Sequence, residues 1–329
     1  MVRVFVYEHM TASSRIPAES LYREGRAMRD AIRDDLGAVP GVEVVSFPDF
    51  APIDSFESLV RGCDAALVIA PEFDGILESL VRRVEAVGVP VLGPSAAAVR
   101  LTADKLATAR VWASAGIPSP LTESVLDWAE SRVPCVIKPR FGAGSTATYF
   151  CGNTETFLRH RQAVREGFSG ESIACEFVPG TAVSVAFLIG PAETRPLIPA
   201  LQYVSPDSHF RYDGGELPIP PTLAERAVFL GKRAVERIPG LHGFVGVDLV
   251  LGRADDGTQD RAIEINPRLT TSYVGLRTRA ATNLAGVLLN ICSDKLVGTI
   301  GWKPGHTRFR PDGTVDSAWE KMGPESVRF

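Results

Sequence analysis

Two spacings of apolar residues alternate along the N-terminal part of the chain. Short apolar runs typical of strands are separated by stretches in which apolar residues recur with helical spacing. The predicted strands are 2–7, 42–47, 65–70 and 89–92, and the predicted helices are about 19–36 and 75–87. Because strands that alternate with helices form parallel sheets covered on their faces, residues 1–98 are predicted to form a small parallel-sheet α/β domain.

The rest of the chain has fewer regular signals. One helix is predicted to begin at Thr102 as its N-cap, another at a capping box of Thr222 and Glu225, and a third to span about 283–296. Residues 199–215 are polar and aromatic, so we expect a loop over a pocket, or else a long exposed connection. The C-terminal tail, 301–329, shows little periodicity and is expected to pack loosely or to fray.

Two apolar runs near the end of the chain carry polar side chains. Asp248 lies in the first run, while Glu264 and Asn266 lie two apart in the second and so face one side of a strand. An Asp-Asp-Gly turn signal at 255–257 predicts a hairpin that places Asp248 opposite Glu264. Facing carboxylates repel unless a positive charge lies between them, and oxygen ligands suit Mg²⁺. The alternative is an ordinary hairpin in which one of the three points to solvent.

A lysine and a glycine-containing loop follow an earlier apolar strand. Lys138 closes that strand, and Gly142, Gly144 and Ser145 lie just beyond it. Glycines let backbone N–H groups close around phosphate oxygens while the lysine supplies charge. The lysine precedes the glycines, so this is not a Walker A loop, and a plain hairpin turn is the alternative.

A second lysine lies in the first turn of the helix predicted at Thr102. The helix dipole disfavours a cation in this place, so Lys105 is better explained if it reaches an anion. A tolerated surface lysine is the alternative.

Acidic residues follow two of the N-terminal strands. Glu8 ends the first strand, and Glu72 and Asp74 follow a later one. Ligands of open α/β sheets collect at the carboxyl ends of strands, so these side chains are candidates for contact with a substrate such as a cationic amine. A solvated loop is the alternative for each of them. A dinucleotide site is disfavoured because no G-x-G-x-x-G follows the first strand.

Composition narrows the class of protein. The formal net charge of −4 over 329 residues argues against a nucleic-acid-binding protein. The five cysteines are odd in number and show no C-x-x-C spacing, which disfavours a zinc site or a disulfide framework. The sequence has neither a signal-peptide pattern nor an apolar run of membrane-spanning length, so a cytoplasmic protein with no membrane partner is predicted.

The order of these motifs resembles the ATP-grasp superfamily from about residue 90 to 295. The most specific part is Glu-x-Asn-Pro-Arg at 264–268 with Asp248 upstream. The resemblance implies an N-terminal α/β domain over 1–98, followed by a pair of α+β subdomains that hold ATP between them. The expected bounds are 99–182 for the subdomain with the glycine-containing loop and the hinge, 183–300 for the subdomain with the metal site, and 301–329 for the tail.

The resemblance also implies roles for individual residues. Lys105 and Lys138 would hold the phosphates of ATP, with the loop of Gly142, Gly144 and Ser145 closing over them. Glu176 and the backbone of Val178 would border the adenine. Mg²⁺, or Mn²⁺ in its place, would be bound by Asp248, Glu264 and Asn266. Arg268 would steady the transferring phosphoryl group, and Asn266 and Lys138 complete the expected catalytic set. Ala182 departs from the pattern, because family members often have an acidic ribose contact there.

The implied reaction is ATP-dependent joining of a small carboxylic acid and an amine through an acyl phosphate, with release of ADP. The run 265–273 looks most like the tyramine–glutamate ligase group of furan-cofactor biosynthesis. An ATP-grasp carboxylase that uses bicarbonate and a non-catalytic nucleotide-binding regulatory protein are the alternatives. The oligomeric state is left open. The candidate substrate contacts are Glu8, Glu72, Arg211, Tyr212, Gly215 and Thr271.

Overall fold

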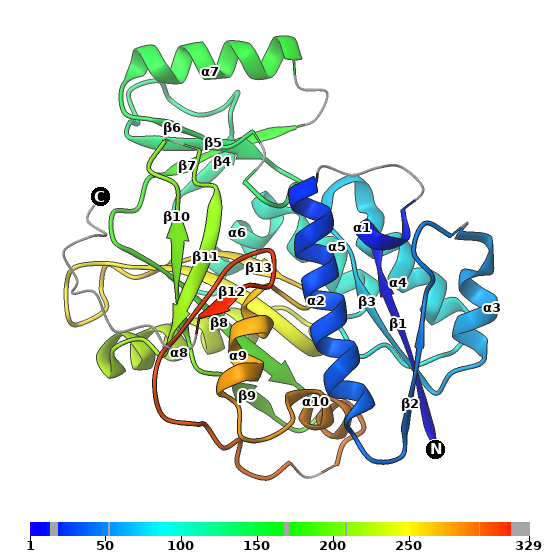
Figure 1. The fold of residues 1–329 in the computed structure, drawn as a ribbon. Coiled ribbons are helices and arrows are strands. Elements are labelled where there is room, and N and C mark those ends of the chain that lie inside the picture. The colour runs from blue at the N-terminus through cyan, green and yellow to red at the C-terminus, as the bar shows by residue number, and fades with distance from the viewer. Residues whose placement is uncertain are drawn as a thin grey trace.

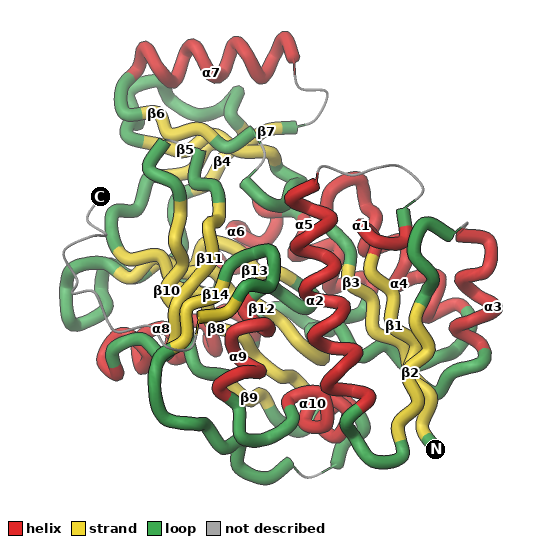
Figure 2. Tube along the Cα trace, viewed as in Figure 1, coloured by secondary structure: helices red, strands yellow, loops and turns green. Residues whose placement is uncertain are grey.

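Three β-sheets organise the part of the chain that the computed structural model describes, which is residues 1–13, 19–51, 53–145, 147–167, 171–207, 209–295 and 297–316. A small sheet with its helices forms the N-terminal unit, and a four-stranded sheet lies above a large antiparallel sheet that packs beside that unit (Figure 1). Figure 2 shows that helices cover each of the three sheets. The mixture of a parallel N-terminal sheet and later α+β layers confirms the predicted fold class.

The N-terminal sheet has the parallel order β2–β1–β3. Its alternating side chains explain the two covered faces, because Val4 and Val6 pack toward α2 while Phe5 and Tyr7 pack toward α3 and α4. The elements are β1 (Val2–Glu8), α1 (His9–Ala12), α2 (Glu19–Gly37), β2 (Val42–Ser46), η1 (Ile53–Ser55), α3 (Phe56–Arg61), β3 (Ala65–Ile69), η2 (Phe73–Gly75) and α4 (Ile76–Ala86).

The fourth strand predicted in this unit, 89–92, is not a strand. The segment runs beside β3, but its pairing is a single parallel bridge between Ala66 and Val91. Pro90 lacks an N–H to donate, and the chain turns into the next helix soon afterwards, so the ladder cannot extend.

The helix predicted to begin at Thr102 is two helices, α5 (Ala96–Ala103) and α6 (Lys105–Ser114). Thr102 lies inside α5, where its hydroxyl donates to the carbonyl of Ala98 at 2.8 Å. The N-cap of α6 is Asp104, which accepts from the N–H of Ala107 at 3.0 Å. Arg140 holds the same carboxylate, with Nε 2.8 Å from Oδ1. Lys105 is therefore the first residue of α6, and the Asp104 cap fixes its position.

The four-stranded sheet is antiparallel in the order β4–β7–β5–β6. It consists of β4 (Thr122–Ser124), β5 (Cys135–Pro139), β6 (Tyr149–Cys151) and β7 (Ser172–Glu176), and α7 (Thr154–Gly167) covers it. Ile137 and Phe157 are wholly buried between sheet and helix, with Trp128 closing the end. Lys138 alternates with Ile137, so it points to the face that α7 leaves uncovered.

The large sheet has the order β13–β12–β8–β10–β11–β14–β15, with β9 beside β8. Val183, Val185 and Phe187 of β8 pack under α8, whereas Ala186 and Leu188 pack toward α9 and α10. Its elements are β8 (Thr181–Ile189), β9 (Thr194–Pro196), β10 (Ala200–Val204), β11 (Tyr212–Leu217), α8 (Pro221–Val235), β12 (Gly243–Leu251), β13 (Arg261–Asn266), α9 (Ser272–Arg279), α10 (Leu284–Cys292), β14 (Thr307–Phe309) and β15 (Val315–Asp316).

Four expectations about this part of the chain are corrected in whole or in part. Residues 199–215 form most of the β10–β11 hairpin, so the expected loop is limited to the connection between these strands, while the segment does line a cavity as expected. The α8 helix begins after Pro220 without a side-chain cap, so the predicted Thr222–Glu225 capping box is wrong; Pro221 at its first turn replaces it. Of the tail expected to pack loosely or to fray, residues 301–316 contribute to the sheet, because β14 pairs with β11 and buries Phe309; residues 317–329 lie outside the described residues. The helix predicted to reach 296 ends at Cys292, and residue 296 lies outside the described residues.

Two observations bear on the class of protein. The five cysteines are free thiols, four of them buried. Within the described ranges, none of the helices combines the length and apolar character needed to cross a membrane.

Candidate active site

The β12–β13 hairpin brings the predicted carboxylates together. Asp248 pairs directly with Glu264, as the turn signal predicted, and Asn266 pairs with Gly246. The register shifts just after this pair, since Leu249 faces Ala262, which leaves Ile263 as the extra residue of a bulge. The bulge places both Ile263 and Glu264 on the cavity described below.

Basic side chains compensate the charge of Glu264. The Nζ atoms of Lys105 and Lys138 lie 3.6 and 3.8 Å from its Oε2. Burial by itself would raise the pKa of Glu264, but the two lysines and Arg268 outweigh burial and hold this pKa below its ordinary value. Glu264 is therefore ionised at neutral pH and links a helix, a strand and a hairpin from different parts of the chain.

Asp248 is held by amide donors. Gln202 Nε2 donates to Oδ1 and Asn266 Nδ2 donates to Oδ2, each at 2.9 Å. Burial and the facing charge of Glu264 raise the pKa of Asp248 to about 6, against the opposing effect of the hydrogen bonds from Asn266, Ser184 and Gln202. A cation between the two carboxylates would remove this repulsion.

The chemistry of these side chains fits a hard divalent cation. Asp248 and Glu264 present carboxylate oxygens, and the amide nitrogen of Asn266 points at Asp248, which turns its carbonyl oxygen away from that carboxylate. Mg²⁺ is commonly bound through one or two carboxylates together with substrate phosphates, and Mn²⁺ accepts the same oxygen ligands. The donor set therefore suits Mg²⁺ or Mn²⁺ held jointly with a phosphate-bearing substrate.

The glycine-containing loop crosses between the four-stranded sheet and the β10–β11 hairpin. Lys105 Nζ donates to the carbonyl of Gly142 at 2.6 Å, and Ser145 Oγ donates to the carbonyl of Phe210 at 2.8 Å. Gly144 has φ +67°, a left-handed conformation that glycine adopts without steric cost. The loop thus touches a helical lysine at one end and the opposite hairpin at the other.

A cavity of about 1250 Å³ lies between the four-stranded sheet and the large sheet. Most of the residues singled out in the sequence line it, although they come from widely separated elements. Those brought together are Lys105, Lys138, Gly142, Gly144, Ser145, Glu176, Val178, Tyr212, Asp248, Glu264, Asn266, Arg268 and Thr271.

The end of the cavity next to β7 is more apolar. Val136, Phe177, Val178, Leu249 and Ile263 lie along it. The carboxylate of Glu176 accepts from the backbone N–H of Leu121 at 3.1 Å, and that contact ties the end of β7 to the segment before β4. An apolar slot beside exposed backbone groups is the usual form of a pocket for a planar heterocycle.

Ala182 also lines the cavity. Its methyl side chain cannot accept a hydrogen bond. The cavity therefore has no acidic side chain at the position where family members often contact the ribose.

Arg268 has a carboxylate partner from the N-terminal unit. Its Nε lies 2.9 Å from Oε1 of Glu72, and its Nη2 donates to Oε2 at 3.3 Å. Glu72 is buried and does not line the cavity, so its position differs from that of the expected substrate contact. It acts on the site through Arg268, which does line the cavity.

Three other candidate substrate residues lie away from the cavity lining. Glu8 is buried and accepts from the N–H groups of Met10 and Thr11 as the cap of α1. Arg211 is exposed at the surface and pairs with Asp207. A Cβ on Gly215 would lie 2.5 Å from the carbonyl of Leu201, so this glycine permits close packing of strands.

The candidate site residues chosen from the sequence left out several polar side chains of the cavity, of which Gln202 and Glu24 matter most here. Gln202 holds Asp248, and Glu24 reaches the cavity from α2, where its carboxylate accepts from the hydroxyl of Thr271. Gln202 lay in the segment expected to be a loop, and strand alternation could have found it, because it shares a face of β10 with Ala200, the partner of Ser184. Glu24 is one of several charged residues on an amphipathic helix, and its sequence position carries no distinguishing signal.

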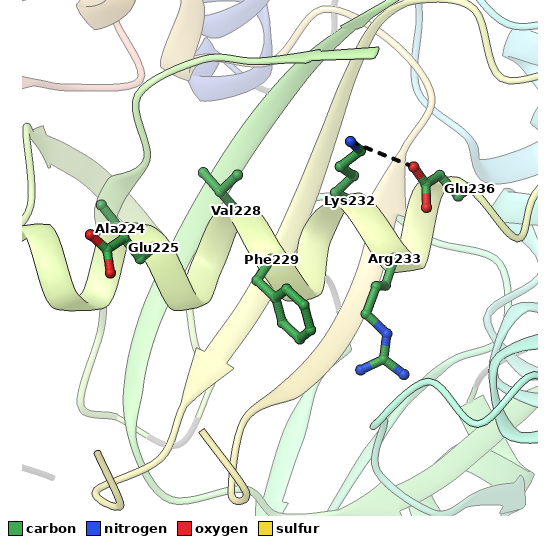
Figure 3. A pocket seen from close by; sticks show the side chains of 7 residues that line it. All are labelled: Ala224, Glu225, Val228, Phe229, Lys232, Arg233 and Glu236. Carbon is green, nitrogen blue, oxygen red and sulfur yellow. Dashed lines mark ion pairs between the residues drawn. The ribbon is translucent and has the colours of Figure 1, made fainter. Parts of the chain in front are cut away.

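A smaller hollow of about 670 Å³ lies along the outer face of α8 (Figure 3). Its lining comes from one helix, with Phe229 projecting to solvent and Lys232 3.9 Å from Glu236. This is a solvated helix face with an i,i+4 ion pair, and it lacks the convergent polar groups of the larger cavity.

Nucleotide binding is expected to slow amide exchange in the glycine-containing loop. Residues 140–145 are small or exposed for the most part, so contacts to phosphates would add the main restraint on them. Hydrogen–deuterium exchange with and without a non-hydrolysable ATP analogue measures the effect, and β1 serves as the internal control. Unchanged exchange across 140–145 at saturating analogue would contradict a role for the loop in holding nucleotide.

Comparison with known proteins agrees with this geometry. The family model described as an ATP-grasp domain matches residues 102–272, and a pre-ATP-grasp domain matches 27–99. Tyramine–L-glutamate ligase of Methanocaldococcus jannaschii is 26% identical over 301 residues, covering 84% of this chain and 86% of that protein. D-alanine–D-alanine ligase of Ralstonia pickettii is 25% identical and covers 70% of this chain and 75% of its own length.

The solved structures are similar as well. A putative ATP-grasp superfamily protein from Archaeoglobus fulgidus superposes with a TM-score of 0.68 at 26% identity, over 94% of this chain and 92% of that one. The family model spans more than half of the chain and includes both lysines, the glycine-containing loop and the carboxylate hairpin. The chain therefore belongs to the ATP-grasp family, among its ligases.

Proposed function

We propose that this protein is an ATP-dependent carboxylate–amine ligase that forms an amide through an acyl phosphate. The observation that carries the proposal is the convergence of Lys105 and Lys138 on Glu264, directly opposite Asp248. Two cations beside two carboxylates at the mouth of an apolar slot are suited to a nucleotide triphosphate bound with a divalent metal.

The residues of the cavity divide into nucleotide, metal and phosphoryl groups. The apolar end near Val178 would hold the adenine, with Glu176 at its border, and Lys105, Lys138 and the loop of Gly142, Gly144 and Ser145 would hold the phosphates. Mg²⁺, bound by Asp248, Glu264 and Asn266, would supply charge neutralisation at the phosphates. Arg268, oriented by Glu72, would face the oxygens of the transferring phosphoryl group.

The reaction proceeds in two displacements. A carboxylate oxygen of the acid attacks the terminal phosphorus of ATP and the bond to the bridging oxygen breaks, which releases ADP and forms the acyl phosphate. The amine nitrogen, having lost its ammonium proton, then attacks the acyl carbon, and inorganic phosphate leaves. Catalysis of this kind depends on positioning and electrostatic stabilisation, so a nucleophilic side chain is not required.

The first substrate pair to test is L-glutamate with tyramine. Two tyramine–L-glutamate ligases are 26% and 27% identical to this chain, each over 84% of its length. The run 265–273 also resembles that group. A place in furan-cofactor biosynthesis, as that group has, forms part of the same proposal.

A product screen tests the ligase function. Amino acids are crossed with amines in the presence of ATP and Mg²⁺, ADP release is followed, and the ligated product is identified by mass spectrometry. We expect an amide product and ADP from at least one pair. ADP release that depends on bicarbonate and ignores amines would indicate a carboxylase. Nucleotide binding without turnover for any pair would indicate a regulatory protein.

The oxygen balance of the acyl phosphate gives a sharper prediction. An acid labelled with ¹⁸O in its carboxylate should pass one labelled oxygen into inorganic phosphate for each amide formed, because that oxygen bridges carbon and phosphorus in the intermediate. Mass spectrometry of the phosphate measures the transfer. Label in AMP, together with release of pyrophosphate, would contradict the mechanism and indicate an adenylating ligase.

A further inference from the structure

Glu24 brings a carboxylate from the N-terminal unit to the end of the cavity that Arg268 and Thr271 line, which we call the reaction end. It lies on α2, which runs along the boundary between the N-terminal sheet and the large sheet (Figure 1). It is partly buried and lines the cavity together with Arg268, Thr271 and Tyr212. Its position is fixed, because Oε1 accepts from the hydroxyl of the buried Thr271.

Within the described part of the chain, Glu24 has no cation within ion-pair distance, in contrast to Glu264 and Glu72. Glu264 has two lysines within ion-pair distance, and Glu72 has Arg268. Asp248 has the amide donors of Gln202 and Asn266. Glu24 has a neutral hydroxyl as its hydrogen-bond donor and belongs to no ion pair among the described residues; the positive charge of Arg268, which acts on it at longer range, is already paired with Glu72. A partly buried carboxylate left in this state is stabilised by a cation that enters with the substrate.

Tyr212 completes the surroundings of this carboxylate. Its ring lines the cavity, and burial raises the pKa of its hydroxyl well above the ordinary value, with the negative charges of Glu24 and Asp248 adding to the effect. The phenol therefore stays neutral, and an aromatic side chain beside a carboxylate is a favourable setting for an ammonium group.

We propose that Glu24 binds a primary ammonium group of a substrate and is the residue that selects for it. The inference rests on the proposed ligase function and deepens it, since it assigns the group that recognises the amino-bearing substrate. The ammonium has two sources in such a reaction, the α-ammonium of an amino acid whose carboxylate is activated, or the amine co-substrate before it loses its proton. In both cases the recognised chemistry is the same cation.

The test compares wild type with Glu24→Gln, which keeps the shape of the side chain and removes its charge. L-Glutamate and tyramine are the first probes, replaced by the active pair if the product screen finds another. We expect the KM for one ammonium-bearing substrate to rise about tenfold or more, because a charged partner is lost in a partly buried site. The KM for ATP should stay unchanged, since the residues assigned to the phosphates are untouched.

The arms of the experiment separate the two sources. A raised KM for L-glutamate, together with equally poor use of glutarate by both proteins, assigns the ammonium to the acid. A raised KM for tyramine alone assigns it to the amine. Glu19→Gln is the matched control, because Glu19 lies on the same helix but is exposed and pairs with Arg23. Glu24→Asp keeps the charge and should recover part of the loss, which a purely structural role would not require.

Failure of the two proposals can be told apart. If wild type ligates a pair and Glu24→Gln leaves both substrate KM values unchanged, the assignment of Glu24 is overturned and the ligase function stands. If wild type forms no ligated product with any pair, the ligase function fails and the assignment fails with it. If Glu24→Gln does not fold, the substrate range of wild type tests the assignment instead. Equal use of glutarate and L-glutamate, together with equal use of uncharged nucleophiles and tyramine, would overturn the assignment of Glu24.

Discussion

Glu264→Gln is expected to lower turnover by about a hundredfold or more while leaving the protein folded. The substitution keeps the shape of the side chain but removes a charge that faces Asp248 and binds the phosphate-bridging metal in the proposed site. Metal ions that neutralise phosphoryl oxygens contribute several kcal/mol to the barrier, which corresponds to a loss of about that size. Steady-state ADP release at saturating Mg²⁺ gives the turnover, and thermal unfolding reports on the fold.

Stability should change little in this variant, because two effects oppose each other. Losing the carboxylate leaves Lys105 and Lys138 without their shared partner, but it also removes the repulsion that helps raise the pKa of Asp248. Asp256→Asn is the matched control, since it neutralises an exposed acid in the turn of the same hairpin. Turnover of Glu264→Gln near that of wild type would contradict the assignment of Glu264 as a metal ligand.

Arg268→Lys is expected to lose most activity, by about a hundredfold, although the positive charge remains. The guanidinium is planar and is oriented in the cavity wall by Glu72, because Nη2 donates to Oε2 at 3.3 Å and Nε lies within ion-pair distance of Oε1. A lysine ammonium cannot make this paired contact and face phosphoryl oxygens at the same time. Removal of one oriented donor from a developing charge typically has an effect of this size. The measured quantity is kcat/KM for the active substrate pair.

Arg277→Lys controls for the general effect of replacing a paired arginine. Arg277 on α9 contacts Asp35 through Nε at 3.0 Å and Nη2 at 2.6 Å, so it makes a similar fork outside the cavity. Its replacement should lower the melting temperature without changing kcat/KM. Equal and small losses in both variants would show that Arg268 supports the structure and does not act on the phosphoryl group.

The pairs around Arg268 make the site a composite of two units. Glu72 contacts Arg268, Glu24 contacts Thr271, and Asp35 accepts from the hydroxyl of Tyr273 at 2.6 Å. All three acids belong to the N-terminal unit, and all three partners belong to the segment that follows β13. The N-terminal unit thus orients the segment that carries Arg268, and substitutions far from the nucleotide can alter the reaction end of the cavity.

Much of the proposed phosphate-binding part of the site follows from the sequence. The Asp-Asp-Gly turn sets the centre of the hairpin, and the two-residue period of strands then makes Asp248 and Glu264 face each other. Lys138 likewise takes its direction from the alternation of β5. These predictions hold because turn chemistry and strand alternation are local properties, which a few neighbouring residues determine.

Short elements were decided by tertiary contacts. Three-residue β14 has too few positions to show a period, and it is ordered by pairing with β11 and by Phe309 packing against Gly215 and Gly275. Asp104 is the cap of α6 in place of the predicted Thr102 because Arg140, distant in sequence, fixes its carboxylate. In such places the free energy comes from non-local partners, so local pattern does not report it.

The difference between what local sequence pattern predicts and what tertiary contacts decide is clearest at the reaction end of the cavity. Glu8, Glu24 and Glu72 are all acids of the N-terminal unit, yet one caps a helix, one enters the cavity and one holds Arg268. Composition and spacing do not separate them, because each role depends on how α2 and the end of β3 pack against the segment after β13. The sequence by itself determined the fold class and the hairpin, loop and lysines to which we assign phosphate binding. The tertiary structure alone decided which carboxylate enters the cavity, since that choice is made by contacts between units.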